Sequence, residues 1–372
     1  MRKRKNIAVI IFMLSSLFLV NFSSPGLSFA DRVGLKSGRE IAGDILENTD
    51  KYIKLNYQGV ILTYWREDIA YIKSDASPAA TAVIYSPPFS YQHDALKEAG
   101  LKTSRKSFLW QVNSGTNTSY ILGSLHLATK EIYPLNRVIE DAFDESDTLA
   151  VEADVTEGGL AASMEMMGKG MYPLGQTLEA GISRRTLALL MERLKELSMD
   201  INMLNMYRPW FLAMQLEIME LLKLGFDPNY GIDMYFLKRA KEGKDIEELE
   251  SISYQLKLFD NLTDKEQDIF LFSTLIDLNL LEEKMEKIIA SWKTGDADAM
   301  ERMLREGLEK YPEMRVVYDK IIFNRNRNMA EKIAGFLNSG RTYFIIVGAA
   351  HLIGREGIIQ ILKDKGYDIK QI

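Results

Sequence analysis

The chain has 372 residues, of which 47% are hydrophobic and 26% are charged, a composition typical of a globular protein with a substantial core. Its formal net charge of -6 and the absence of a basic stripe argue against a nucleic-acid partner. It contains no cysteine, which excludes disulfides and cysteine-linked lipids.

The first thirty residues have the pattern of a secretory signal peptide. Basic residues in 1–5 precede an apolar stretch from Ile7 to Phe22, and the small residues Ser28 and Ala30 suit a cleavage site. The stretch is short for a membrane-spanning helix, and no second candidate follows. We therefore expect an extracytoplasmic protein, whether periplasmic, at the cell surface or secreted, with membrane contact only through the signal segment. An uncleaved N-terminal anchor is the alternative.

Residues 31–74 are expected to form a small β-barrel. Short stretches alternate apolar and polar residues at the regular spacing that is typical of small barrels. The pattern resembles the Sm- or SH3-like modules that follow signal peptides in bacterial envelope proteins. The expected strands lie within Asp31–Gly38, Glu40–Ile45, Tyr52–Leu55, Val60–Tyr64 and Ile69–Ile72.

Residues 75–106 are expected to be a linker, since they hold three of the nine prolines and a scatter of small and charged residues. His93 lies in this stretch and is expected to be a solvated linker histidine. The remaining part of the chain, residues 107–372, is expected to form one larger domain.

The larger domain alternates strand and helix patterns at both ends and is largely helical in between. A hairpin, a helix and a strand are expected first, residues 155–335 are mostly helical by periodicity, and a strand, a helix and a strand follow. This order predicts an α/β fold with a mixed sheet built from two halves and a large helical insertion. The expected strands and helices are Phe108–Val112, Ser119–Leu122, Leu135–Phe143, Asp147–Asp154, the buried helix Trp210–Leu224, Thr342–Val347, Gly357–Lys365 and Tyr367–Ile372, with helix caps at Ser183, Asp264, Asp296 and Asn324.

One phrase occurs twice in this domain. An apolar strand pattern is followed by Gly-x-x-His, first as Gly123-Ser-Leu-His126 and again as Gly348-Ala-Ala-His351, in a chain with only three histidines. In open α/β sheets, ligands bind beyond the carboxyl ends of the strands. The two imidazoles could therefore meet in one site, where the glycines permit a sharp turn or a close approach to a ligand.

A carboxylate completes this candidate site. Glu152 ends the predicted strand between the two histidine phrases. Two imidazoles and a carboxylate suit a divalent transition metal with an open position for water, which is hydrolase chemistry. Without a metal, His126, Glu152 and His351 could act as a general base and an orienting acid.

The ordered set of motifs resembles a known family. From about Lys106 to Ile372 the chain is similar to the TraB/GumN/PrgY family, which includes the Tiki proteases that cleave Wnt ligands. One position departs from the pattern, because Asn324 stands where the family often has an acid. The matching residues are the two Gly-x-x-His phrases, Val151-Glu-Ala-Asp154, Gly231-Ile-Asp233, Leu249-Glu250, Gln255 and Arg325-Asn326.

The resemblance implies a related α/β fold and a metal-dependent peptidase-like activity on a peptide or protein substrate. The implied metal is Mn²⁺ or Co²⁺, with Zn²⁺ as an alternative, held by His126, Glu152 and His351. Arg325 joins these three as a catalytic residue. The implied substrate-binding residues are Asp233, Glu250, Asn326, Gly123 and Gly348.

Two classes of function stay open at this point. The first is a secreted metallopeptidase or related hydrolase. The second is a protein of the cell envelope that binds or sequesters a peptide or signal in the same site without turnover. Three of these residues could instead have structural roles. Asp233 could cap a helix, Glu250 could lie at the surface, and Arg325 could be an ion-pair partner.

Overall fold

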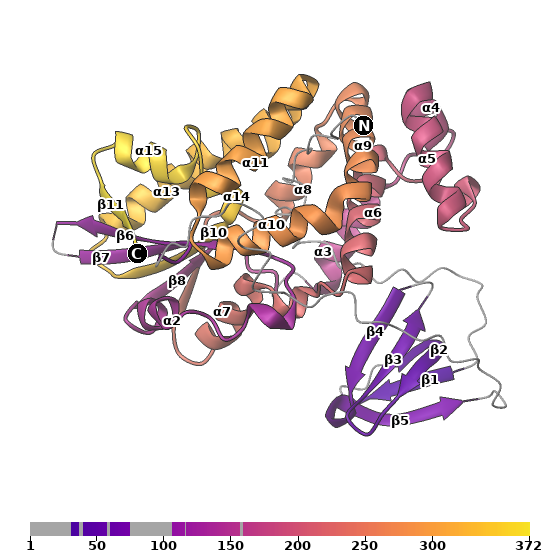
Figure 1. Ribbon diagram of the computed structural model, residues 1–372, viewed down its shortest axis with the longest axis horizontal. Helices are drawn as coiled ribbons and strands as arrows, with labels where there is room; N and C mark the ends of the chain where they lie inside the picture. Colours follow the sequence, from indigo (N-terminus) through magenta and orange to yellow (C-terminus); the bar gives the residue numbers. More distant parts are fainter. Residues whose placement is uncertain (1–30, 37–39, 58–59, 75–105, 116, 157–158) are drawn as a thin grey trace. The chain divides into compact units, whose positions relative to one another are not determined.

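The computed structural model describes residues 31–36, 40–57, 60–74, 106–115, 117–156 and 159–372. They fall into a small antiparallel β unit and a larger α/β unit, each described by itself below (Figure 1). The expected signal peptide, His93 and almost all of the expected linker lie outside these residues. In the part of the chain that is described, no helix is both long enough and apolar enough to cross a membrane.

The small unit is a five-stranded antiparallel sheet in the order β4-β3-β2-β1-β5. Alternate residues of a strand face the same side, which is why the alternation in the sequence yields one buried face. Its buried core consists of Val33, Ile53, Leu55 and Ile69. The strands are β1 Asp31–Leu35, β2 Glu40–Asn48, β3 Tyr52–Tyr57, β4 Val60–Trp65 and β5 Ile69–Ser74.

The large unit is built on a six-stranded mixed sheet in the order β11-β6-β7-β10-β8-β9. Strands β7, β10, β8 and β9 run parallel, while β6 pairs antiparallel with both β7 and β11. Strand β10, from the C-terminal end of the domain, lies between β7 and β8 from its N-terminal part, which confirms the mixed sheet built from two halves. The strands are β6 Leu109–Ser114, β7 Asn117–Ser124, β8 Thr148–Val151, β9 Asp245–Glu248, β10 Tyr343–Gly348 and β11 Asp368–Gln371.

Helices cover both faces of this sheet. Helices α2 (Arg137–Asp144) and α7 (Ile232–Ala240) lie on one face, and α13 (Asn324–Leu337) and α15 (Ile358–Asp364) lie on the other (Figure 1). The short helix α14 (Ala349–Leu352) directly follows β10. The remaining helices form most of the insertion between β8 and β10: α3 Gly159–Gly170, α4 Leu178–Gly181, α5 Arg184–Glu196, α6 Pro209–Lys223, α8 Ile252–Asp260, α9 Asp264–Asp277, α10 Leu281–Lys293, α11 Ala297–Lys310 and α12 Arg315–Tyr318.

The structure differs from the sequence-based expectation inside the insertion. Strand β9 interrupts a region expected to be helical, because the exposed edge of β8 provides backbone partners for an acidic segment of low strand propensity. Thr263, and not Asp264, caps α9 through a reciprocal pair of hydrogen bonds with Glu266. Asn324 caps no helix, since α13 continues directly from a π-helical turn, Asp319–Phe323.

The insertion buries a cluster of charged side chains. Glu217 of α6, Asp277 of α9 and Lys284 of α10 are all buried, and Lys284 Nζ lies 2.8 Å from an Asp277 carboxylate oxygen. Burial raises the pKa of Glu217 well above its usual value, and the charge of Asp277 adds to the shift. Burial also raises the pKa of Asp277 to about 7 against the opposing effect of Lys284. At pH values between the usual and the raised pKa, these carboxyl groups keep a proton in the folded chain that the unfolded chain would release.

Candidate functional site

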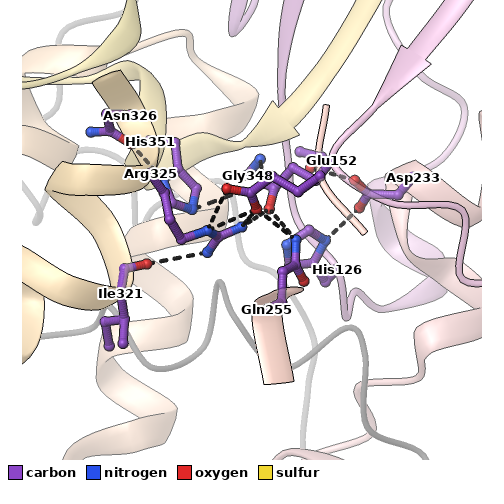
Figure 2. A network of polar contacts seen from close by, with 11 residues as sticks. His126, Glu152, Asp233, Gln255, Ile321, Arg325, Asn326, Gly348 and His351 are labelled. Atoms are coloured by element: carbon purple, nitrogen blue, oxygen red, sulfur yellow. Dashed lines mark hydrogen bonds and ion pairs between the residues drawn. The ribbon is translucent and has the colours of Figure 1, made fainter. Parts of the chain in front are cut away.

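The parallel strands end in register, and this brings distant residues to one edge of the sheet. Ser124, the last residue of β7, pairs with Gly348 at the end of β10, and β10 also pairs with β8 up to Val151. His126, Glu152 and His351 each follow one of these strand ends by one to three residues. They therefore meet at the carboxyl edge of the sheet, as Figure 2 shows.

The three side chains surround one point beside Gly348. A β-carbon placed on Gly348 would lie 3.2 Å from Glu152 Oε1, 3.3 Å from His126 Nε2 and 3.5 Å from His351 Cδ2. His351 Nε2 lies 4.0 Å from Glu152 Oε1. The missing side chain of Gly348 thus leaves the space into which both imidazoles and the carboxylate face.

His126 is oriented by a carboxylate from α7. Its Nδ1 lies 2.7 Å from Asp233 Oδ2, while Asp233 Oδ1 accepts a 2.8 Å hydrogen bond from the Ser124 hydroxyl. Because a carboxylate only accepts, Nδ1 carries a proton, and the neutral ring has its lone pair on Nε2. Burial is the largest single influence and by itself lowers the pKa of His126, but the charge of Asp233, its hydrogen bond and the charge of Glu152 together raise the pKa overall.

Glycine is required where α7 approaches this histidine. A β-carbon on Gly231 would lie only 2.2 Å from the His126 carbonyl oxygen, so any other residue would push the start of α7 away. The Ile232 N–H donates to Leu125 O at 3.0 Å in the same contact. Asp233 is the second residue of α7 and does not cap it, so its side chain is free to reach His126 and Ser124.

His351 is oriented by an amide from α13. Asn326 donates from Nδ2 to Glu356 O at 2.7 Å, which turns its Oδ1 toward His351 Nδ1 at 2.6 Å. The ring therefore carries its proton on Nδ1, and its Nε2 is buried without a hydrogen-bond partner in the described structure. Burial lowers the pKa of His351 to about 3, so the ring is neutral at ordinary pH.

Glu152 is held as an anion. Its Oε1 accepts a 2.6 Å hydrogen bond from the Gly348 N–H, and its Oε2 accepts one of 2.6 Å from Arg325 Nη2. Burial alone would raise the pKa of Glu152, but His351 when protonated, Arg325 and His126 together lower it to about 2. The carboxylate therefore faces the space beside Gly348 in its charged form.

Arg325 joins two carboxylates and is itself almost fully buried. It donates from Nε and Nη2 to Glu250 Oε2 at 2.9 and 2.7 Å, in addition to its contact with Glu152. Its Nη1 donates to Ile321 O at 3.2 Å. This carbonyl belongs to the π-helical turn, where backbone hydrogen bonds span one residue more than in an α-helix. Gln255 Nε2 donates to Glu250 Oε2 at 3.0 Å and completes the network.

The structure thus brings together most of the residues named from the sequence, but only some of them face the space beside Gly348. Asn326 and Glu250 are buried, and the protein itself occupies their polar atoms, so they hold His351 and Arg325 in place. Gly123 packs against Phe108, whose ring would be 2.4 Å from a β-carbon there. Asp154 stays outside the network and accepts from the Thr156 N–H.

Ser124 was not among the residues named from the sequence, although it lies inside the first Gly-x-x-His phrase. The only sequence signal was its place between the glycine and the histidine. Its function as a donor to Asp233 depends on a contact across 109 residues of sequence, which periodicity cannot reveal.

The donor set fits a divalent transition metal. Among the residues that the structure describes, no three His, Cys, Asp or Glu side chains already stand at the spacing of a preformed metal site. The chemistry nevertheless matches. Each of the two imidazoles is held through Nδ1, which leaves its Nε2 available, and both lie beside an anionic carboxylate. The unpartnered Nε2 of His351 is a buried acceptor that a metal or a water would satisfy.

Comparisons with known proteins identify a family and relatives for the larger part of the chain. Residues 108–371 match the model of the TraB/PrgY/gumN family. An uncharacterized protein, YbaP of Escherichia coli (strain K12), is 26% identical over 250 residues, which cover 67% of this chain and 89% of YbaP. A metalloprotease TIKI homolog of Amphimedon queenslandica is 22% identical over 322 residues, 72% of this chain and 62% of the homolog. Metalloprotease TIKI2 of Danio rerio is 20% identical over 337 residues, 75% and 64% of the two chains. No solved structure gives a significant match.

Proposed function

The chain belongs to the TraB/PrgY/gumN family, and we propose that it is a metal-dependent hydrolase that cleaves peptide bonds in peptides or proteins. The observation that carries the proposal is the convergence of His126, His351 and Glu152 on the space beside Gly348. The relatives named as metalloproteases support the choice of peptide bonds.

In this proposal, His126 and His351 hold a divalent ion through Nε2, together with Glu152. Mn²⁺ and Co²⁺ are the first ions to test, and Zn²⁺ is the alternative, since imidazole and carboxylate suit all three. When bound, such an ion acts as a Lewis acid and lowers the pKa of a bound water.

The surrounding residues keep these groups ready. Asp233 and Asn326 hold the two imidazoles in the tautomer that leaves Nε2 available. Arg325 keeps Glu152 charged, and Glu250 balances the charge of Arg325 in turn. Preorganised groups of this kind need not rearrange when charge develops in the reaction.

We also propose that the protein acts outside the cytoplasm. The basic, apolar and small-residue pattern of residues 1–30 supports export, and membrane contact would occur only through that segment. Cell fractionation would compare the full chain with a chain that lacks residues 1–30. Recovery of both chains in the cytoplasm would contradict the proposal.

Peptide cleavage by the purified full chain tests the proposed activity. A peptide library is incubated with Mn²⁺, Co²⁺ or Zn²⁺, and again after addition of a chelator, which should stop cleavage. His126→Ala and His351→Ala should each abolish cleavage without unfolding the protein. The double variant should be no worse than either single variant, since the ligands act as a unit. His93→Ala is the matched control, because it removes the third histidine and should leave cleavage unchanged.

The same experiment separates the two classes of function. Wild-type protein that binds no divalent metal by calorimetry and cleaves no peptide would refute the hydrolase. Tight binding of peptides under those conditions would instead support a protein that sequesters a peptide or signal.

A further inference from the structure

One helix end contacts both ends of the segment that carries His126. Trp292, near the end of α10, donates from its indole Nε1 to Gly123 O at 2.6 Å in a buried hydrogen bond. The next residue, Lys293, donates from Nζ to Glu131 O at 2.6 Å. These two carbonyls flank His126 at a distance of three and five residues along the chain.

The tryptophan is the more rigid of these two donors. Its indole has a single polar group, an N–H that can only donate. The Trp292 side chain is buried, so packing holds the ring while the N–H reaches the strand end. Lys293 is half-buried on a flexible stem, and its hydrogen bond is exposed. Trp292 therefore contributes most of the geometric constraint.

The end of α10 is itself anchored to the sheet. Gln371, the last residue of β11, donates from Nε2 to Gly295 O at 2.7 Å and to Ser107 O at 2.9 Å. Gly295 has a φ of +64°, and a β-carbon there would lie 2.4 Å from Lys106 O. A glycine at this position thus lets α10 end against the chain that enters β6.

The start of α7 holds the other side of the same segment. Ile232 N donates to Leu125 O at 3.0 Å and Asp227 N donates to Ala128 O at 2.9 Å, while Asp233 holds the ring of His126. The segment therefore has its middle tied to the start of α7 and the chain that leads into it, and its two ends tied to α10. At the end of β7, the Trp292 hydrogen bond holds the Gly123 carbonyl, in addition to the pairing of β7 with β10 and the hydrogen bond from Gly123 N to Phe108 O.

We propose that Trp292, assisted by Lys293, is a positioning residue for His126. Its indole N–H fixes the carbonyl at the end of β7, and this sets the direction in which the chain leaves the strand and presents the imidazole. The consequence for metal binding rests on the proposed function, whereas the consequence for the order of residues 124–131 does not.

Trp292→Phe tests the proposal, with Trp210→Phe as a matched control. Both tryptophans are buried, but the Nε1 of Trp210 has no hydrogen-bond partner in the described structure. Both substitutions remove the same atoms, and only Trp292→Phe removes a hydrogen bond. The full-chain variants are compared by calorimetry with Mn²⁺ or Co²⁺ alone, by hydrogen exchange of the amides of residues 124–131 and by thermal melting.

Trp292→Phe is expected to weaken metal binding by about 10-fold, the lower end of the effect of losing an outer-shell contact. It should also speed hydrogen exchange in residues 124–131 by about 10-fold, while Trp210→Phe changes neither. If Trp292→Phe has the same metal affinity and the same hydrogen exchange in residues 124–131 as the wild type, the proposal is overturned.

Two further results remain decisive. If the wild-type protein binds no metal and cleaves nothing, the proposed function fails, and hydrogen exchange alone then decides whether Trp292 orders the segment. If Trp292→Phe does not fold, Lys293→Met removes the second donor from a half-buried position. Faster hydrogen exchange near residue 131 in Lys293→Met would support the proposed restraint by α10, and unchanged exchange there would refute it.

Discussion

Replacing Gly348 with alanine tests the reaction centre with a single methyl group. Gly348 has φ −49° and ψ 134°, a backbone conformation open to alanine, so the change adds volume without backbone strain. The new β-carbon would lie 3.2 Å from Glu152 Oε1 and 3.3 Å from His126 Nε2. Optimal contacts between nonbonded heavy atoms are about 3.5–4.0 Å, so these groups must move apart by a few tenths of an ångström.

The expected magnitudes follow from this crowding. Overpacking of one methyl group costs about 1–3 kcal/mol in the free energy of unfolding. The loss of hydrolysis should be at most about 10²-fold, the effect of a misplacement of about 1 Å in reacting groups, because the shift here is a few tenths of an ångström. This upper limit equals about 2.7 kcal/mol of transition-state stabilisation, at about 1.36 kcal/mol for each factor of ten.

Thermal melting, metal calorimetry and peptide hydrolysis measure these effects. Gly335→Ala is the matched control, because Gly335 lies in α13 and a β-carbon there would meet no atom within 4 Å. It should leave hydrolysis unchanged and stabilise the protein by about 0.5–1 kcal/mol, the usual gain from replacing a helical glycine. If Gly348→Ala binds metal and hydrolyses peptides like the wild type, the space beside Gly348 is not the reaction centre.

Three further substitutions probe the network and the helical core. Arg325→Lys should lower the free energy of unfolding by about 3–5 kcal/mol, since an ammonium lacks the planar fork that bonds both buried carboxylates at once; a melt like that of the wild type would contradict this. Asn326→Ala should weaken Mn²⁺ binding by about 10- to 100-fold, because His351 loses its partner at Nδ1; unchanged affinity in calorimetry would exclude this function. Glu217 and Asp277 have pKa values raised in the folded chain, so the free energy of unfolding should fall as pH rises from about 5 to about 7, by up to about 1.4 kcal/mol per pH unit for each proton. Glu217→Gln should make this fall about half as steep in urea melts, and an equally steep fall would show that Glu217 does not hold a proton.

The strands and the position of the histidines could be predicted from local sequence. Apolar runs followed by Gly-x-x-His indicated strands that end shortly before His126 and His351, and a strand pattern ending in acids placed Glu152 at a strand end as well. Because parallel strands of one sheet end at a common edge, this pattern was sufficient to predict that the three side chains meet.

The hairpin, the final strand–helix–strand and the buried helix α6 were predicted from the same kind of signal. Each depends on hydrophobic periodicity within a short window, which reports which face of the element is buried. Strand β9 carries no such signal, because its acidic residues are mostly exposed and its pairing with β8 alone makes it a strand.

Only the tertiary structure decided what holds the site together. Asp233 reaches His126 across 107 residues, Arg325 reaches Glu152 across 173, and Trp292 reaches Gly123 across 169. The π-helical turn before α13 supplies a carbonyl for Arg325, whereas the sequence suggested a helix cap at Asn324. Local periodicity states which side of a helix or strand is buried, whereas a hydrogen-bond partner is selected only when distant segments pack and each buried polar group must be satisfied.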